Sequence, residues 1–363
     1  MRKCVILQAE AIHEIITPGI IKVLNELSFK PVLYFNIECS IRRGDFFKYC
    51  TDLEFELNEI ALVGRQAWLD LQNEIKAQSP EFLLVNTLQK NDRIEWYNEL
   101  DLPTIGIVHN IHKFLETDFA FEFIAKKNVH IFTIASHVSL YMRNKIGFDK
   151  TNVDSFVPAY LKPISNSKRK YKQDGKIRLA IIGGINNIRN RGFDSLLNEL
   201  KENKEDYKGF EFVICGGGAD RERLEKFVDQ YELNDFFDFV EVSEESHYVM
   251  YDNYYKSIED SDFLITLFPK ADIKYFKFKA TASIMTALSL DLPIMTDTIA
   301  RCIYNVPCIS YSNDEYSEIF RTLKSFTEAS YNELRSETIK YKELAVSRGV
   351  KSFEIAIKNI LNT

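Results

Sequence analysis

The segment KIRLAIIGGINNIRNRGFDSLL, residues 176–197, shows how this chain is built. Its apolar beginning is typical of a buried strand and ends in a glycine pair. A polar loop with two arginines then leads to another glycine and an amphipathic helix. Glycine lets the backbone approach a phosphate closely, a helix start offers free N–H groups, and guanidiniums add positive charge. The segment therefore predicts an anion site. The residues expected to form it are Gly183, Gly184, Arg189, Arg191 and Gly192.

The same alternation of apolar strands and amphipathic helices extends in both directions from this segment. Before it, apolar runs typical of buried strands occupy residues 4–7, 31–35, 82–85, 104–108 and 130–134. After it, the corresponding runs occupy residues 210–215, 237–242, 263–267, 293–296 and 308–311. Helical patterns separate these runs, and such alternation builds parallel sheets covered by helices on both faces. The fold class that we expect is α/β.

The length of the chain and one polar segment divide it into two domains. At 363 residues the chain exceeds what one ordinary core holds. Residues 162–176 lose apolar periodicity, which indicates a linker. We therefore expect a first domain at 1–161, a second at 177–340 and a final helical segment at 341–363. Each domain is expected to be a doubly wound, Rossmann-like sheet, with a central cleft between the two.

Composition argues against several classes of function and location. The net charge of −7 argues against a nucleic-acid binder, since a phosphate backbone demands a basic surface. Six cysteines without a CxxC pair fit free thiols in a reducing compartment better than disulfides or a zinc site. Neither a signal peptide nor an apolar segment of membrane-spanning length is evident. We expect a cytoplasmic protein, either soluble or in peripheral contact with the inner face of the plasma membrane.

A second basic group stands ahead of a predicted helix start. Lys277 and Lys279 precede Thr281 and Ser283, where the apolar run of a helix begins. Lysines beside small hydroxyl residues at a helix N-terminus are suited to binding a diphosphate. The alternative is that both lysines belong to a solvated edge.

Five segments of the second half resemble, in the same order, the C-terminal domain of nucleotide-sugar glycosyltransferases with the GT-B fold, most closely the retaining group called family four. The segments are AIIGGINNIRNRGFDSLL, FEFVICGGGADRERLEKFV, FVEVSEE, YYKSIEDSDFLITLF and ATASIMTALSLDLPIMTD. Arg191 and Gly192 fall on the family's basic–glycine pair, while Leu292 and Pro293 fall on its leucine–proline pair. In the first half, IGIVHNIH, IFTIASHV and SFVPAYL match more loosely.

The resemblance implies a glycosyltransferase that moves a sugar from a nucleotide diphosphate sugar, in its UDP form, to a saccharide or lipid-linked acceptor. The second domain is then expected to bind the donor, the first to hold the acceptor, and the last helix to pack back on the first domain. By analogy with relatives, the reaction belongs to bacterial cell-surface polysaccharide synthesis, such as capsule or O-antigen assembly. No cofactor beyond the donor itself is implied.

An acidic cluster imitates the metal-binding DxD motif of another glycosyltransferase fold. In this chain Asp260, Ser261 and Asp262 close a predicted helix ahead of a buried strand, so we expect a solvent-facing helix end. The spacing of histidines, cysteines and carboxylates suggests no metal site elsewhere. A metal-independent reaction follows, in which arginines, lysines and helix N-termini stabilise the departing diphosphate.

The sequence departs from the family at its two glutamates, eight positions apart, which fall on Phe278 and Thr286. In the family the second glutamate accepts hydrogen bonds from the ribose, and the first lies near the donor sugar. Without these glutamates, the stereochemistry of the transfer stays open. Two alternative functions also remain: a catalytically silent protein of the same fold that acts as a scaffold or partner subunit, or a nucleotide-sugar epimerase. Besides the anion site, the residues expected to bind the donor are Lys277, Lys279, Thr281, Ser283 and Thr286.

Candidate catalytic and acceptor-side residues follow the strands of the first half. His109 comes directly after the strand at 104–108, whose carboxyl end faces the predicted cleft. We expect His109 to contact the donor sugar or to position the acceptor hydroxyl; the alternative is a histidine bonded to neighbouring backbone. The acceptor-side residues expected are His112 and, at a place where the family binds acceptor or donor phosphate, His13 and Glu14.

Overall fold

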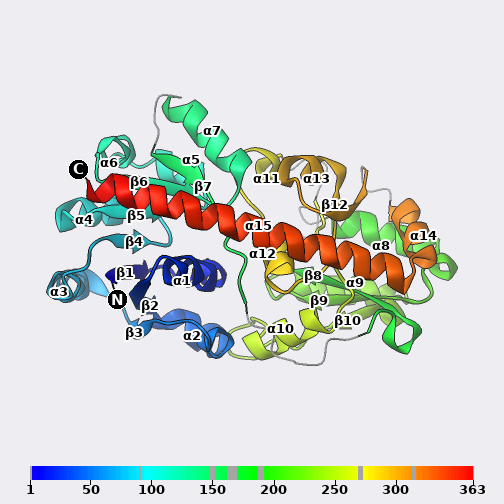
Figure 1. The fold of residues 1–363 in the computed structure, drawn as a ribbon. Helices are drawn as coiled ribbons and strands as arrows, with labels where there is room; N and C mark the ends of the chain where they lie inside the picture. Colours follow the sequence, from blue (N-terminus) through cyan, green and yellow to red (C-terminus); the bar gives the residue numbers. More distant parts are fainter. Residues whose placement is uncertain are drawn as a thin grey trace.

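The computed structural model contains two parallel β-sheets, one in each half of the chain, set side by side (Figure 1). It describes residues 2–89, 91–147, 152–161, 170–186, 192–268, 273–312 and 316–362. Within both sheets the neighbouring strands run parallel. The predictions of an α/β class and of two doubly wound domains are therefore confirmed.

The first sheet has the strand order β3-β2-β1-β4-β5-β6-β7. Its strands are β1 (Arg2–Gln8), β2 (Phe29–Asn36), β3 (Glu56–Ile60), β4 (Leu83–Val85), β5 (Thr104–Ile107), β6 (Val129–Thr133) and β7 (Val153–Ser155). The helices of this half are α1 (Thr17–Glu26), α2 (Ile37–Arg43), α3 (Gly64–Ala77), α4 (Asn91–Leu100), α5 (Ile111–Leu115), α6 (Ala120–Ala125) and α7 (Ser136–Ile146). The strand order reverses at β1, which opens a crevice beyond the carboxyl ends of β1 and β4.

The second sheet has the strand order β10-β9-β8-β11-β12-β13 and reverses at β8. Its strands are β8 (Ile177–Ile182), β9 (Phe210–Cys215), β10 (Phe237–Phe239), β11 (Phe263–Ile265), β12 (Ile294–Asp297) and β13 (Cys308–Tyr311). The helices are α8 (Phe193–Glu202), α9 (Arg221–Gln230), α10 (Tyr251–Glu259), α11 (Lys274–Lys277), α12 (Ala282–Ser289), α13 (Thr298–Tyr304), α14 (Tyr316–Ser325) and α15 (Glu328–Leu361). A second crevice follows beyond the carboxyl ends of β8 and β11.

Helix α15 crosses both halves of the molecule and is the orange-to-red helix in the foreground of Figure 1. It contacts α12 in the second half and α1, β5, β6 and β7 in the first. It begins at Glu328, well before the predicted start at residue 341, and Thr327 caps it by accepting a hydrogen bond from the Ser330 N–H at 3.1 Å. The predicted boundary after residue 340 therefore falls inside one continuous helix. Neither α15 nor any other helix in the described part of the chain has the length and apolar character needed to cross a membrane.

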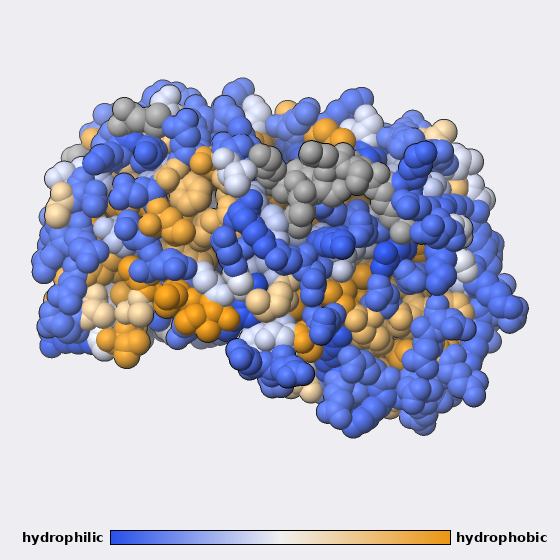
Figure 2. Space-filling model, turned by 90° about the horizontal axis from the view of Figure 1, so that it is seen from below, coloured by the Kyte–Doolittle hydropathy of each residue, from blue (hydrophilic) through white to orange (hydrophobic). Residues whose placement is uncertain are grey.

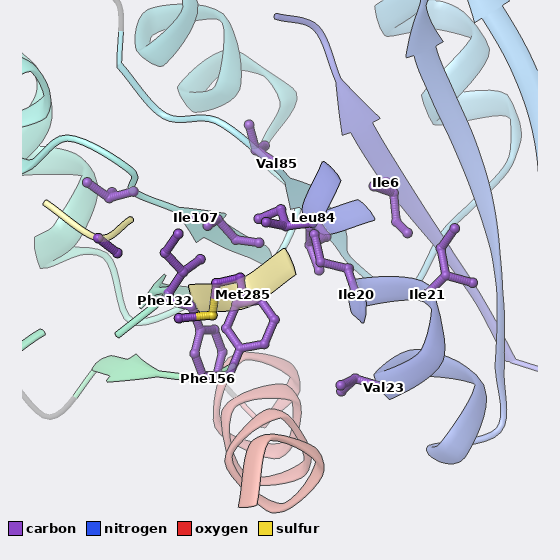
Figure 3. Close-up of a cluster of buried hydrophobic side chains, with 14 of the residues drawn as sticks. Ile6, Ile20, Ile21, Val23, Leu84, Val85, Ile107, Phe132, Phe156 and Met285 are labelled. Atoms are coloured by element: carbon purple, nitrogen blue, oxygen red, sulfur yellow. The ribbon is translucent and has the colours of Figure 1, made fainter. Parts of the chain in front are cut away.

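The buried core of the first half continues into the second. Figure 3 shows Ile107 on the first sheet, with Met285 of α12 beside Phe132 and Phe156. These side chains belong to one cluster of buried apolar residues that spans both halves. The two domains therefore meet through a packed apolar contact, which fixes how their strand ends face each other.

The acidic cluster at 260–262 corrects one expectation from the sequence. Asp262 is only 2% exposed, so its predicted solvent-facing position is wrong. Its carboxylate accepts hydrogen bonds from the backbone N–H groups of Arg178 at 2.8 Å and Lys172 at 3.3 Å. Burial is tolerated because these bonds satisfy the charge, and the carboxylate ties the end of the predicted linker to the start of β8.

Candidate functional site

A cavity lies between the two halves, beyond the carboxyl ends of β1 and β8, and contains about 1150 Å³ of space that opens to solvent. The first half lines it with residues 11–16, Arg42, Arg43, His109 and Ile134. The second half lines it with Ile182, Gly183, Tyr248, Tyr254, Tyr275 and residues 279–283. We call this cavity the cleft. The central cleft that the sequence predicted is thus present.

Two histidines stack against each other in the wall of the cleft. The rings of His13 and His109 lie 3.9 Å apart between centroids, at an interplanar angle of 3°. The Nε2 atom of His109 lies 2.7 Å from the carbonyl oxygen of Asn86. Because a carbonyl only accepts hydrogen bonds, Nε2 carries the proton and Nδ1 presents a lone pair. That Nδ1 is buried and has no hydrogen-bond partner in the described part of the chain.

Both rings are uncharged at neutral pH. Burial, opposed by the hydrogen bond to Asn86 and assisted by the nearby charge of Lys279, lowers the pKa of His109 to about 4. Burial also lowers the pKa of His13 well below its ordinary value, with His109 and Lys279 acting in the same direction. A neutral His109 is suited to accepting a hydrogen bond from a hydroxyl group through Nδ1. It is therefore better suited to positioning a hydroxyl than to removing its proton at neutral pH.

The lowered pKa of His109 predicts a loss of stability in acid. Between pH 6.5 and about pH 4 the unfolded chain binds a proton that the folded chain does not, so the free energy of unfolding falls as pH decreases through this window. The loss approaches about 3 kcal/mol at the acid end. We expect His109→Asn to lose less stability than the wild type in urea unfolding from about pH 7.5 to about pH 4.5. The control is His247→Asn, at an exposed histidine outside the cleft, which should follow the wild type. Parallel curves for wild type and His109→Asn would contradict the assignment.

Lys279 stands at the contact between the two halves. Its backbone forms an antiparallel bridge with Asn110 of the first domain, and its carbonyl oxygen lies 3.4 Å from the Nε2 atom of His137. These contacts fix the main chain, while the ammonium group lies 5.4 Å from the centre of the Tyr275 ring. The ammonium makes no ion pair with any residue that the structure describes, so its charge is available to a ligand in the cleft.

The start of α12 lies next to Lys279. Thr281 caps this helix by accepting a hydrogen bond from the Ser283 N–H at 3.2 Å, and its own N–H donates to the Tyr304 hydroxyl at 3.0 Å. Other N–H groups of a first helical turn have no partner within the helix, and the helix dipole makes this end positive. The structure thus brings Lys279, Thr281 and Ser283 together in one wall of the cleft.

The glycine loop after β8 faces the start of α12. Gly183, with a φ of 100°, lines the cleft, and Gly183 and Gly184 line a smaller adjoining cavity with Thr281 and Ser283. A second glycine loop, residues 216–218, follows β9 and has a structural role instead. A β-carbon on Gly216 would come within 2.2 Å of the Gly183 carbonyl oxygen, so side chains are excluded there.

Four residues predicted for the site lie elsewhere. Lys277 ends α11 and is exposed, Thr286 is buried inside α12, and neither lines the cleft. His112 is exposed and packs edge-on against Phe278, with ring centroids 4.1 Å apart, because α5 meets the second domain there. Gly192 precedes α8 with a φ of 72° and does not line the cleft either. Arg189 and Arg191 lie outside the described residues.

Arg43 is a residue of the cleft that the sequence analysis did not identify. Its guanidinium lies 4.4 Å from the ring centre of Tyr251 and 4.7 Å from that of Tyr254, and its Nε donates to the Val249 carbonyl at 3.1 Å. Glu14 completes this group, because its carboxylate accepts a hydrogen bond from the Tyr251 hydroxyl at 2.5 Å and lies 3.8 Å from Arg43. Glu14, predicted for the acceptor side, therefore faces a contact between the domains. The sequence signal for Arg43 was its place in a pair of arginines, Arg42 and Arg43, which indicated a possible contact with anionic lipid headgroups and not a position in the cleft.

Arg42 brings a further positive charge to the cleft. Its guanidinium lies 5.1 Å from the ring centre of Tyr248, and its buried Nε has no hydrogen-bond partner in the described ranges. Arg43 shares its charge with Glu14, whereas neither Arg42 nor Lys279 forms an ion pair with a described carboxylate. An anionic ligand in the cleft is therefore attracted by Arg42, by Lys279 and by the start of α12.

Comparison with known proteins shows the fold of the chain. No model of a known protein family matches the sequence, and no curated protein matches it. HepE of Anabaena, crystallised in complex with UDP and glucose, is similar in structure at 9% identity with a TM-score of 0.64, over 99% of this chain and 100% of HepE. WaaG, a glycosyltransferase involved in lipopolysaccharide biosynthesis, is similar at 10% identity with a TM-score of 0.61, over 96% of this chain and 98% of WaaG.

An epimerase has a similar structure. A putative UDP-N-acetylglucosamine 2-epimerase from Listeria monocytogenes is 7% identical with a TM-score of 0.60, over 97% of this chain and 95% of the epimerase. These matches extend over almost the full length of each chain. The chain therefore has the GT-B fold, as the sequence predicted.

Proposed function

We propose that this protein is a glycosyltransferase that moves a sugar from a nucleotide diphosphate sugar to an acceptor held by the first domain. The observation that carries the proposal is the wall of the cleft in which Lys279 and the start of α12 face the glycine loop after β8. A diphosphate presents negative charge and acceptor oxygens, the groups that an ammonium and free helix N–H groups bind. The proposal rests on this site, since one fold serves several activities.

In the proposed reaction, the bond between the anomeric carbon and a diphosphate oxygen breaks. A new bond joins the same carbon to the oxygen of the acceptor hydroxyl, and the proton of that hydroxyl passes to a solvent water molecule in the open cleft. The electron pair of the broken bond stays on the diphosphate, where Lys279 and the N–H groups of α12 stabilise the added negative charge. His109, through its free Nδ1, accepts a hydrogen bond from a sugar or acceptor hydroxyl and holds it in place.

We further propose a UDP-sugar as the donor and a saccharide or lipid-linked acceptor of bacterial cell-surface polysaccharide synthesis. HepE with its bound UDP and WaaG with its role in lipopolysaccharide biosynthesis support this choice. We propose a metal-independent reaction, since backbone N–H groups occupy the Asp262 carboxylate and the cleft supplies its own cations. A cytoplasmic location is part of the proposal, because the six cysteines are free thiols. A lipid-linked acceptor would add peripheral contact with the membrane.

Thermal unfolding with nucleotides tests the donor site. A ligand that binds only the folded protein stabilises it, by about 2.7 kcal/mol at a hundred times its Kd. We expect UDP to raise the melting temperature more than ADP, GDP or CDP do, and the rise to persist in excess EDTA. If none of the four nucleotides at millimolar concentration shifted the melting temperature, the donor site would be refuted. A shift that EDTA abolished would contradict the metal-independent reaction.

Product analysis separates the transferase from its two alternatives. A transferase releases UDP from a UDP-sugar and joins the sugar to an added acceptor, with an anomeric configuration that NMR reports. An epimerase changes the sugar of the donor without releasing UDP. A silent scaffold binds the donor and leaves it unchanged. NMR spectra of a panel of UDP-sugars, with and without mixed saccharide acceptors, distinguish the three.

A further inference from the structure

A second cavity lies on the first domain, outside the cleft, between α3 and α4, and contains about 1190 Å³ of space that opens to solvent. Trp68 and Leu69 line it from α3, and Arg93, Trp96 and Glu99 line it from α4. We call it the tryptophan pocket. We propose that it binds neutral saccharide units, namely sugars of the acceptor that lie beyond the reacting one. This inference rests on the proposed function, and it names the acceptor class.

The tryptophan pocket lies at the edge of the sheet that faces the cleft. Helices α3 and α4 start a few residues after the ends of β3 and β4, so both starts lie at the carboxyl edge of the first sheet. Arg93 in the pocket forms an ion pair with Glu10. The residues that follow, 11–13, belong to the wall of the cleft. One short loop therefore separates the pocket from the cleft, which is a suitable arrangement for an acceptor longer than one sugar.

The two tryptophans of the chain are both in this pocket. Their rings meet edge to face, with centroids 5.0 Å apart and an interplanar angle of 75°. The Nε1–H of Trp96 donates to the carbonyl oxygen of Trp68 at 3.1 Å. Trp96 is buried and Trp68 is half-buried, so Trp96 fixes the wall against which Trp68 stands. The Arg93 guanidinium lies 5.3 Å from the centre of the Trp68 ring. The part of this fixed indole that stays exposed offers the apolar C–H face of a pyranose a surface at little entropic cost.

The charged groups around the pocket select the class of ligand. Arg65 lies at the start of α3, and Glu95 and Glu99 lie along α4; all three are exposed and line the pocket. Two carboxylates repel an anion, and the guanidiniums repel a cation. A sugar hydroxyl both donates to a carboxylate and accepts from a guanidinium. A neutral polyhydroxylated ligand therefore matches this mixture of charges.

A lipid surface is the competing occupant. Apolar side chains gather over the first domain on the face shown in Figure 2, and Val63 and Leu69 near the pocket are exposed. Glu95 and Glu99 make no ion pair with any residue that the structure describes, so docking this region into a bilayer would remove two unpaired carboxylates from water at a large free-energy cost. The carboxylates therefore favour a saccharide over a membrane.

Tryptophan fluorescence of the full chain tests the proposal. Because both tryptophans lie in the pocket, their emission reports on this site alone. The probes are glucose and N-acetylglucosamine oligosaccharides of one to five units, added to about 10 mM, where a weak site with millimolar Kd is occupied. We expect a saturable change in emission with at least one series, at lower concentration for longer chains. No change with any probe would overturn the proposal.

Variants of the pocket identify the site of binding. We expect Trp68→Ala to weaken the saccharide affinity about tenfold or more in calorimetry, and Trp68→Tyr to keep most of it, since the aromatic plane remains. Trp68→Ala also removes packing, so Arg65→Ala, at an exposed residue, is the second variant; it should weaken binding with no change in melting temperature. Lys76→Ala, at the other end of α3, is the matched control and should bind as the wild type. Equal losses in Arg65→Ala and Lys76→Ala would overturn the assignment.

Separate readouts distinguish this inference from the donor site. We expect UDP affinity to be unchanged in Trp68→Ala, because the pocket lies outside the cleft. Binding of UDP without binding of any saccharide refutes the tryptophan pocket and leaves the proposed function standing. Saccharide binding without UDP binding refutes the transferase and leaves a saccharide-binding protein. Sedimentation with vesicles that contain anionic lipid, if it depended on Trp68 in the absence of saccharide binding, would assign the pocket to a membrane and overturn the proposal.

Discussion

Replacement of Lys279 by alanine is expected to lower kcat for sugar transfer by about 10²- to 10³-fold, the usual cost of removing one preorganised group that stabilises the charge of a leaving group. The ammonium has no ion-pair partner in the described part of the chain and faces the glycine loop across the start of α12. Negative charge on the diphosphate grows as its bond to the sugar breaks, so the loss falls mainly on the transition state. Steady-state kinetics with a UDP-sugar measures it.

Lys277→Ala is the matched control for this prediction. Lys277 lies two positions earlier, carries the same charge and is exposed outside the cleft, so its removal should change kcat less than about twofold. Lys279→Arg should retain part of the activity because the charge remains, although its geometry differs. Equal losses in Lys277→Ala and Lys279→Ala would show that general charge, and not this wall of the cleft, binds the donor.

A second readout of Lys279→Ala does not depend on substrate. The charge of Lys279 contributes to the lowered pKa of both His13 and His109. Removing it should raise the pKa of His109, as measured by NMR titration of the imidazole in the absence of ligand. Burial remains the larger cause, so the pKa should stay below its ordinary value of 6.5. An unchanged pKa would contradict the placement of the ammonium near the histidine pair.

Local sequence patterns, namely apolar runs, glycines and helical periods, predicted individual strands and helices. An apolar run bounded by Gly183 identified β8, and the helical period that follows Gly192 identified α8. The carboxyl ends of these strands face the cleft because parallel order allows no other arrangement at the switch point. The same reasoning placed His109 in the wall of the cleft from its position directly after β5.

Contacts between the domains determine which side chains reach the cleft, and the sequence alone could not predict these contacts. Lys277 and Lys279 look alike in the sequence, yet the backbone bridge between Lys279 and Asn110 directs only one of them to the cleft. Arg43 owes its position to tyrosines of α10, more than two hundred residues away. No periodicity encodes such pairs, because they form only when the two sheets are already packed together.

Replacement of Phe353 by alanine is expected to lower the free energy of unfolding by about 3–5 kcal/mol, the usual cost of deleting a fully buried phenylalanine. Phe353 lies on α15 and is 0% exposed. Its ring stacks on Phe132 of β6 with centroids 4.2 Å apart and meets Phe156 edge-on at 4.9 Å. The cavity that the substitution leaves would lie where α15 meets the first sheet, within the cluster of buried apolar residues that includes Met285 of α12.

The control for this prediction is Ile355→Ala, two positions along the same helix. Ile355 is 58% exposed, and alanine favours a helix, so its free energy of unfolding should change by less than about 0.5 kcal/mol. Phe353→Leu should cost less than Phe353→Ala, since leucine fills part of the cavity. Urea unfolding followed by circular dichroism measures all three. A loss below about 1 kcal/mol in Phe353→Ala would show that α15 is not anchored to the first domain by this aromatic cluster. A loss of about 3–5 kcal/mol would show that this cluster anchors α15, which also contacts α12, to the first domain.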